Sequence, residues 1–208
     1  MIRRACALLV CLFLAGHAEE PWLPRIARAL QASPGWKVEL RWTVKPAAGG
    51  LARPRTTEGV LRLSTDNKFR FESSAMTALS DGTTAWQYSP STAQVLVQSV
   101  AKLDPAQLPG TLLSQATTGS EKSAVRESLE GVETVRLDLA VGKGALSRYS
   151  RASLWARVSD LRPVRILVAD AQGAETRWDL VSWSRWKPSA NDFLWKAPAG
   201  SETVDLRD

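Results

Sequence analysis

Residues 36–44 read Trp-Lys-Val-Glu-Leu-Arg-Trp-Thr-Val, so apolar and polar side chains alternate along the whole stretch. Successive side chains of a β-strand point to opposite faces, and the pattern therefore predicts a strand with one apolar and one solvated face. Similar stretches follow at residues 61–63, 69–71, 84–88, 94–98, 134–141, 154–158, 164–168, 176–183 and 193–195. About nine to eleven antiparallel strands at this spacing favour a barrel or a strongly curved sheet.

Two stretches of the chain have helical rather than alternating spacing. The positions i, i+3, i+4 and i+7 of one apolar stripe are occupied by Leu23, Ile26, Ala27 and Leu30. Residues 103–115 also have helical spacing and predict one or two short helices, interrupted at Pro109-Gly110. A polar loop is expected at 114–123, and turns are expected at 80–82 and 170–173. The predicted fold class is mainly β with short helices (α+β).

The N-terminal segment has the features of a secretory signal. Arg3 and Arg4 precede an apolar run at 5–15, and Gly16-His17-Ala18 has small residues at the positions that signal peptidases prefer. Because the run is short for a bilayer span, a cleaved signal is favoured over a membrane anchor. We expect residues 1–18 to be removed on export and residues 19–208 to form a single domain.

Removal of this segment would change the chemistry available to the protein. Both cysteines, Cys6 and Cys11, and the one histidine, His17, would be lost. Thiol nucleophiles, Ser-His-Asp relays, disulfides and zinc sites with Cys or His ligands are then excluded. No phosphate-binding loop or other cofactor motif occurs, so we expect no cofactor and no metal.

Charged residues are spread along the chain. Loss of Arg3 and Arg4 lowers the formal charge from +6 to +4, and the absence of a basic run argues against nucleic acid as a partner. Acidic residues such as Glu39, Asp138 and Asp179 alternate with apolar ones, as expected on a solvated strand face. A distant pair of carboxylates acting as in a glycosidase stays open.

Tryptophan is frequent, with nine residues against four Phe and two Tyr. Several Trp residues are placed on the predicted strands as Leu and Val are, so they belong to an apolar face that must be buried. Phe69 and Phe71 alternate with Arg70 and Glu72 and are expected on the same concave face. Two interpretations remain open from the residues: a packed core, or an apolar cavity for a lipid or acyl chain that helices cover.

Five stretches of the sequence form a recognisable series. They are the predicted N-terminal helix leading into residues 36–44; Glu58-Gly59-Val60-Leu61-Arg62-Leu63 with Lys68-Phe69-Arg70-Phe71; S-D-G-x-x-x-W-x-Y-x-P with Gln94-Val95, over residues 80–95; residues 109–113; and F-x-W-x-x-P-x-G with Val204-Asp205, over residues 193–205. In this order they resemble the LolA family, the periplasmic carriers of outer-membrane lipoproteins.

The resemblance implies an unclosed antiparallel barrel, with helices forming a lid over an apolar cavity that holds acyl chains, and no chemical reaction. We expect the cavity to be lined by Trp42, Leu61, Leu63, Phe69, Phe71, Trp86, Val95 and Trp178. Phe69 lies where the family has a cargo-contacting aromatic residue. The expected lid residues are Leu23, Ile26, Leu30, Leu108, Leu112 and Leu113.

The family resemblance also implies partners. A monomeric carrier would receive lipoprotein from an inner-membrane release transporter and pass it to an outer-membrane acceptor. Proteobacterial members often have Arg-Pro after the first long strand, where the Arg bonds to the lid, but this chain has Ser64-Thr65-Asp66-Asn67 there. Two other functions therefore stay open: a carrier or sensor of another lipid or amphiphile on the same scaffold, and an exported carboxylate-dependent hydrolase.

Overall fold

A computed structural model of the chain describes residues 20–47, 52–64, 68–103, 113, 117–142 and 146–207. Its strands are β1 (Gly35–Lys45), β2 (Arg55–Ser64), β3 (Lys68–Ser73), β4 (Thr77–Asp81), β5 (Thr84–Ser89), β6 (Gln94–Ser99), β7 (Glu121–Leu129), β8 (Val132–Leu139), β9 (Tyr149–Arg157), β10 (Pro163–Asp170), β11 (Glu175–Arg185) and β12 (Glu202–Asp205). Its helices are α1 (Trp22–Gln31) and the 3₁₀ turns η1 (Val100–Lys102) and η3 (Ala190–Phe193). The expected signal peptide lies outside the described residues, as does most of the expected central helix.

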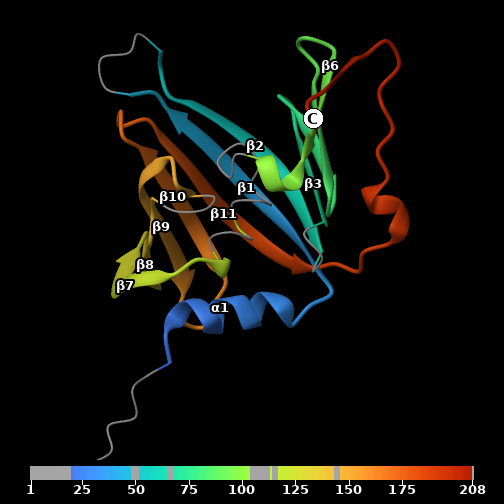
Figure 1. Ribbon diagram of the computed structural model, residues 1–208. Helices are drawn as coiled ribbons and strands as arrows, with labels where there is room; N and C mark the ends of the chain where they lie inside the picture. The colour runs from blue at the N-terminus through green and yellow to red at the C-terminus, as the bar shows by residue number, and fades with distance from the viewer. Residues whose placement is uncertain are drawn as a thin grey trace, which may run out of the picture.

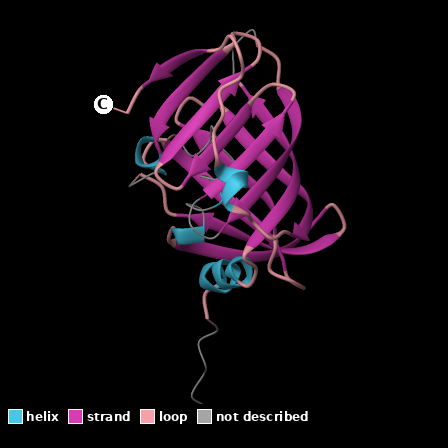
Figure 2. Cartoon of the chain, turned by 90° about the vertical axis from the view of Figure 1, so that its right-hand side faces the viewer, coloured by secondary structure: helices cyan, strands magenta, loops and turns pink. Residues whose placement is uncertain are grey.

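The strands form one sheet in the order β12-β6-β5-β4-β3-β2-β1-β11-β10-β9-β8-β7. Neighbouring strands are antiparallel except β12, which pairs with β6 in parallel. The sheet is strongly curved, and its edge strands β7 and β12 do not pair with each other (Figures 1 and 2). The predicted class, mainly β with an unclosed, curved antiparallel sheet, is confirmed.

Strand β1 lies at the centre of the sheet and joins two halves that are distant in sequence. It pairs with β2 along one edge and with β11, near the end of the chain, along the other. A β-bulge interrupts the β1–β11 register at Glu39/Leu40 and leaves Val181 exposed. The bulge lets Leu180 and Trp183 pair with Leu40 and Val38 on the same side, although simple alternation would separate them.

Helix α1 lies across one end of the curved sheet (Figures 1 and 2). The predicted apolar stripe is confirmed, because Leu23 and Ile26 are buried in the core. Glu121 of β7 accepts a hydrogen bond from the backbone N–H of Leu23 at 2.9 Å, which satisfies one of the free N–H groups in the first helical turn. Trp36 of β1 donates its indole N–H to the carbonyl of Leu30 at 2.7 Å and so fixes the other end.

The C-terminal segment follows the outer side of strands β3 to β6, where Figure 1 shows it in red. The strand predicted at 193–195 is wrong: Ser189 and Asp192 cap the 3₁₀ turn η3, which ends at a buried Phe193. Alternation of Phe193 and Trp195 arises because Phe193 contacts Trp186 and Trp195 stacks on Trp86, not because the segment is paired in the sheet. The last strand is β12, which lies beyond the predicted break at 197–200.

Strands β4 and β7 are absent from the sequence-based prediction. Three consecutive residues of β4, 78–80, are buried, so it has no alternating pattern. Most residues of β7 are exposed, because it lies at the edge of the sheet, and its first residues fall in the segment predicted as a polar loop. The turn at 80–82 is confirmed, with Gly82 at φ 101° and Asp81 accepting the N–H groups of Thr83 and Thr84.

Candidate functional site

The inner, concave face of the sheet carries most of the buried apolar side chains. Cross-strand pairing defines one row across the seven neighbouring strands β2, β1, β11, β10, β9, β8 and β7. In this order its members are Thr57, Trp42, Trp178, Ile166, Leu154, Leu137 and Ala124. No member of this row is charged. A second row on the same face joins Val38, Leu61, Phe71 and Ala78 across β1 to β4.

An aromatic cluster lies where the two halves of the sheet meet. Trp42 and Trp178 are directly paired across β1 and β11, and their rings stack with centroids 4.8 Å apart and planes 12° apart. The ring of Phe71 meets Trp178 edge-on at 6.1 Å. Stacked and edge-to-face contacts of this kind hold aromatic rings in fixed orientations. The cluster therefore gives the middle of the inner face a rigid apolar surface.

Gly59 makes room for this cluster. A Cβ at this position would lie 2.5 Å from Cε2 of Phe71 and 2.8 Å from the carbonyl oxygen of Glu72. The ring of Phe71 therefore packs directly against the backbone of β2, as only glycine allows. The glycine of the Glu58–Leu63 motif is thus a packing requirement of the inner face.

Six of the eight expected cavity residues share this inner face. Leu61, Phe69, Phe71 and Trp178 are buried in the apolar cluster, and Trp42 and Leu63 pack against it while partly exposed. The inner-face placement expected for Phe69 and Phe71 agrees with their pairing to Leu63 and Leu61.

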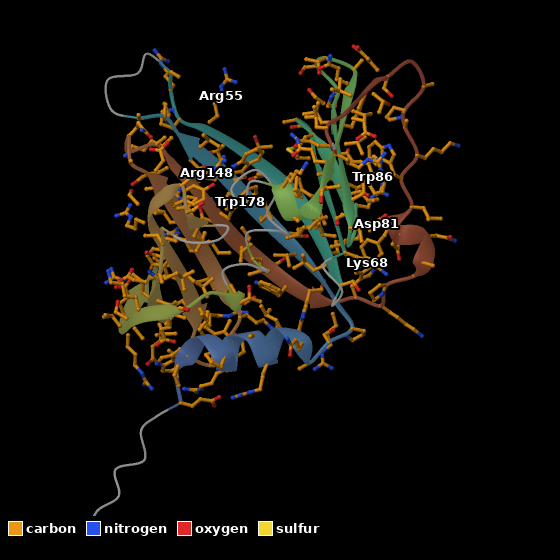
Figure 3. The ribbon with its side chains drawn as sticks, in the orientation of Figure 1. Arg55, Lys68, Asp81, Trp86, Arg148 and Trp178 are labelled. Atoms are coloured by element: carbon orange, nitrogen blue, oxygen red, sulfur yellow. The ribbon has the colours of Figure 1, made fainter. Side chains whose placement is uncertain are left out.

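Trp86 and Val95 lie on the opposite face, which corrects their assignment. Leu79 pairs with Trp86, and Leu79 also pairs with Arg70, whose neighbours Phe69 and Phe71 point inward. Trp86 is therefore on the outer side, beside the C-terminal segment (Figure 3). There it stacks on Trp195 with ring centroids 6.3 Å apart. Val95 pairs with Tyr88, two residues from Trp86, so it shares the outer face. The reason is that the C-terminal segment covers this face too, so an apolar residue here does not mark the inner side.

The expected lid residues divide into three groups. Leu23 and Ile26 of α1 are buried in the inner cluster, and Leu30 packs against it while partly exposed. Leu113 is also buried in the cluster, with 3% of its surface exposed. Leu108 and Leu112 lie outside the described residues. Covering of the inner face by the central segment stays a prediction.

Several inner-face residues are missing from the cavity predicted from the sequence. They include Trp36, Val38, Leu40, Ile166, Leu154 and Leu180, all in the same apolar cluster. Each is apolar within a predicted strand, so the alternation signal was present. Their common face follows only from cross-strand register, which a single sequence does not give.

The outer face carries charged residues, and several of them form ion pairs. Asp179 is buried, with 6% of its surface exposed, and accepts from Arg165 at 2.5 Å while Arg177 lies 3.0 Å away. The expectation of a solvated face is therefore wrong for Asp179, because two arginines cover it. Burial lowers the pKa of Arg165, but hydrogen bonds to Glu130 and Asp179 more than offset this and raise it above its usual value. Asp138 accepts from Ser153 and Ser123, while Glu39 is exposed as expected.

Within the described ranges, no cluster of three or more His, Cys, Asp or Glu could hold a metal ion. In the same part of the chain, no helix has the length and apolarity needed to cross a bilayer.

Comparison with known proteins identifies the fold and the family. The structure is similar to that of a conserved protein from Thermus thermophilus, with a TM-score of 0.56, 14% identity, and coverage of 88% of this chain and 96% of that one. A LolA superfamily protein from Nitrosomonas europaea is also similar, with a TM-score of 0.48, 13% identity, and coverage of 82% and 96%. A search of curated protein sequences finds no match. The family model "Outer membrane lipoprotein carrier protein LolA" matches residues 45–195, and the chain therefore belongs to the LolA family.

Proposed function

We propose that the protein is a periplasmic carrier that holds the acyl chains of lipoproteins against the inner face of its sheet and moves them from the inner to the outer membrane. LolA-family proteins are periplasmic carriers and not enzymes, so the hydrolase alternative is set aside. The observation that carries the proposal is the contrast between the two faces of one sheet. The inner face holds an uncharged row through seven strands, whereas the outer face holds paired ions such as Arg165–Asp179.

Acyl chains suit the inner face for a physical reason. Burial of apolar surface contributes about 0.8 kcal/mol per CH₂ group, so a long acyl chain supplies ample binding energy without any specific polar contact. The curved sheet brings Leu61, Phe71 and Trp178 to one side, and α1 closes one end of this face with Leu23 and Ile26. In the proposed carrier, residues 1–18 direct export, residues 19–208 act as one monomeric domain, and the partners are an inner-membrane release transporter and an outer-membrane acceptor.

A second candidate is a carrier of another lipid or amphiphile. One sequence observation favours it: the stretch 64–67 lacks the Arg-Pro that proteobacterial carriers often have after the first long strand. The same inner face would serve either cargo, because burial of hydrocarbon does not depend on what is attached to it.

Native mass spectrometry of the protein purified from the periplasm separates these candidates. We expect a bound lipoprotein; free lipid alone would support the second candidate, and no lipid of either kind would contradict both. Two Leu→Glu variants provide a matched test. Leu63→Glu, on the inner face, should lose the cargo, whereas Leu194→Glu, which is 65% exposed, should retain it. Circular dichroism should show that both variants are folded, so that a loss of cargo reports on binding.

A further inference from the structure

Two indole N–H groups on the inner face have no acceptor in the described part of the chain. The Nε1 atoms of Trp42 and Trp178 are buried, and neither has a hydrogen-bond partner among the described residues. Two arginine Nε atoms share that condition, but each has a carboxylate oxygen within 4 Å, at Asp179 for Arg177 and at Asp138 for Arg136. The two indoles have no such counter-charge. They are therefore exceptional among the buried polar groups.

Other tryptophans of the protein show how these groups are normally satisfied. Trp36 donates to the carbonyl of Leu30 at 2.7 Å, Trp183 to the carbonyl of Pro163 at 2.8 Å, and Trp155 to Oε1 of Glu127 at 2.6 Å. These three indoles thus have acceptors, whereas the two at the centre of the inner face have none among the described residues. A Phe at either central position could stack without burying an unpaired donor, so the N–H groups carry a cost that the packing does not explain.

The surroundings decide which ligand could accept from these donors. The row that contains Trp42 and Trp178 is uncharged across all seven strands, and the neighbouring pair on the same face is Leu40 with Leu180. The row itself offers an ionised carboxylate no counter-ion, which makes burial of one there unfavourable. A neutral carbonyl oxygen attached to a long hydrocarbon satisfies the donors without this penalty. An ester meets both conditions.

We propose that the indole N–H groups of Trp42 and Trp178 donate hydrogen bonds to the ester carbonyl of a bound acyl chain, and so make the inner face selective for acyl esters over hydrocarbon alone. This inference rests on the proposed function, because it requires that acyl cargo lies on the inner face. It adds a polar recognition element to a surface that otherwise binds through apolar contact. Full burial of Trp178 and its stacking on Trp42 hold both donors in place.

Two fluorescent probes of equal length test the proposal: a long-chain methyl ester and the methyl ether that has CH₂ in place of the carbonyl. We expect the intact protein to bind the ester about 3- to 10-fold more tightly, the range of one net hydrogen bond, and more tightly still if both indoles donate. Trp178→Phe and Trp42→Phe should lose the preference for the ester and bind the two probes with similar affinity. Trp183→Phe is the matched control, because its N–H already has an acceptor, and it should keep the preference.

The outcomes test the indole hydrogen bonds and the carrier function separately. Equal affinity of the parent for both probes would overturn the indole proposal and leave the carrier function standing. Failure of the parent to bind either probe would contradict the carrier function itself. If a variant does not fold, NMR of the unaltered protein still tests the proposal. In ¹⁵N NMR spectra, the two indole N–H resonances should move downfield with the ester and not with the ether; unmoved resonances would contradict the proposal.

Discussion

The protein contains two stacked tryptophan pairs, one on each face of the same sheet, and the two pairs have different structural roles. Trp42 and Trp178 are cross-strand neighbours on the inner face, stacked at 4.8 Å, and their N–H groups have no acceptor among the described residues. Trp86 and Trp195 stack at 6.3 Å on the outer face, where Trp195 belongs to the C-terminal segment. The inner pair stabilises a surface proposed to hold cargo. The outer pair fastens one part of the chain to another.

The largest expected difference between the pairs is in stability. Trp178→Ala removes a fully buried ring at the centre of the core and should lower the free energy of unfolding by about 3 to 5 kcal/mol. Trp86→Ala removes a partly exposed ring and should cost about 1 to 2 kcal/mol. Urea unfolding followed by circular dichroism measures both. Similar losses for the two variants would show that the outer pair belongs to the same cooperative core.

A smaller effect is expected at Gly59, which supports only the inner cluster. In Gly59→Ala the new methyl group would lie 2.5 Å from the Phe71 ring, so the ring must move away from the backbone of β2. Overpacking of this kind costs about 1 to 3 kcal/mol. We also expect weaker acyl binding, because Phe71 contacts Trp178. Unchanged stability and binding in Gly59→Ala would contradict the packing role.

The contact of the outer pair should be measurable by a double-mutant cycle. Trp86→Ala, Trp195→Ala and the double variant should give a coupling free energy of about 0.5 to 1.5 kcal/mol, as for other aromatic pairs. Acyl binding should be the same in all three variants, because neither ring lies on the inner face. A loss of binding in these variants would mean that the outer face contributes to the cargo site.

The smallest expected effect concerns pH and the outer face. Burial raises the pKa of Glu72, but hydrogen bonds from Arg62 and Arg70 outweigh it and hold the pKa below its ordinary value of 4.5. A depressed pKa in the folded state contributes stability above pH 4.5 that is lost as the pH falls through the folded-state value. Glu72→Gln should therefore be less stable than the parent at pH 7, by about 0.2 to 1 kcal/mol after solvent screening, and the difference should shrink near pH 3.

Urea unfolding at the two pH values checks this expectation. The loss caused by Trp178→Ala should be the same at both, because no titrating group faces that ring in its row. A constant deficit in Glu72→Gln would show that the ion pairs of Glu72 do not contribute to stability.

Alternation predicts a strand well when only one of its faces is covered. Residues 36–44 form β1 as predicted, and residues 61–63 and 69–71 lie within β2 and β3. The prediction fails for two strands that lack an alternating pattern. Strand β4 has buried residues on both sides, and β7 is exposed at the sheet edge.

The same physical reason limits prediction of the site. Trp42, Phe71 and Trp178 could be placed on one apolar face because their strands alternate apolar and charged residues. Trp86 and Val95 could not, because the C-terminal segment makes the outer face apolar at that end of the sheet. Identification of that segment as a cover requires the stacking of Trp195 on Trp86, a contact between residues more than a hundred positions apart. Cross-strand register, and with it the unpaired state of the two indoles, was likewise beyond a single sequence.

Photolabelling with an acyl ester that carries a diazirine on its chain tests the central claim most directly. After irradiation, peptide mass mapping locates the covalent adducts along the chain. The proposed carrier predicts adducts at inner-face residues such as Trp42, Leu61 and Phe71, with competition by unlabelled ester. Adducts that are competed by unlabelled ester but lie at Trp86, Val95 or Trp195 would place the cargo on the outer face and contradict the account.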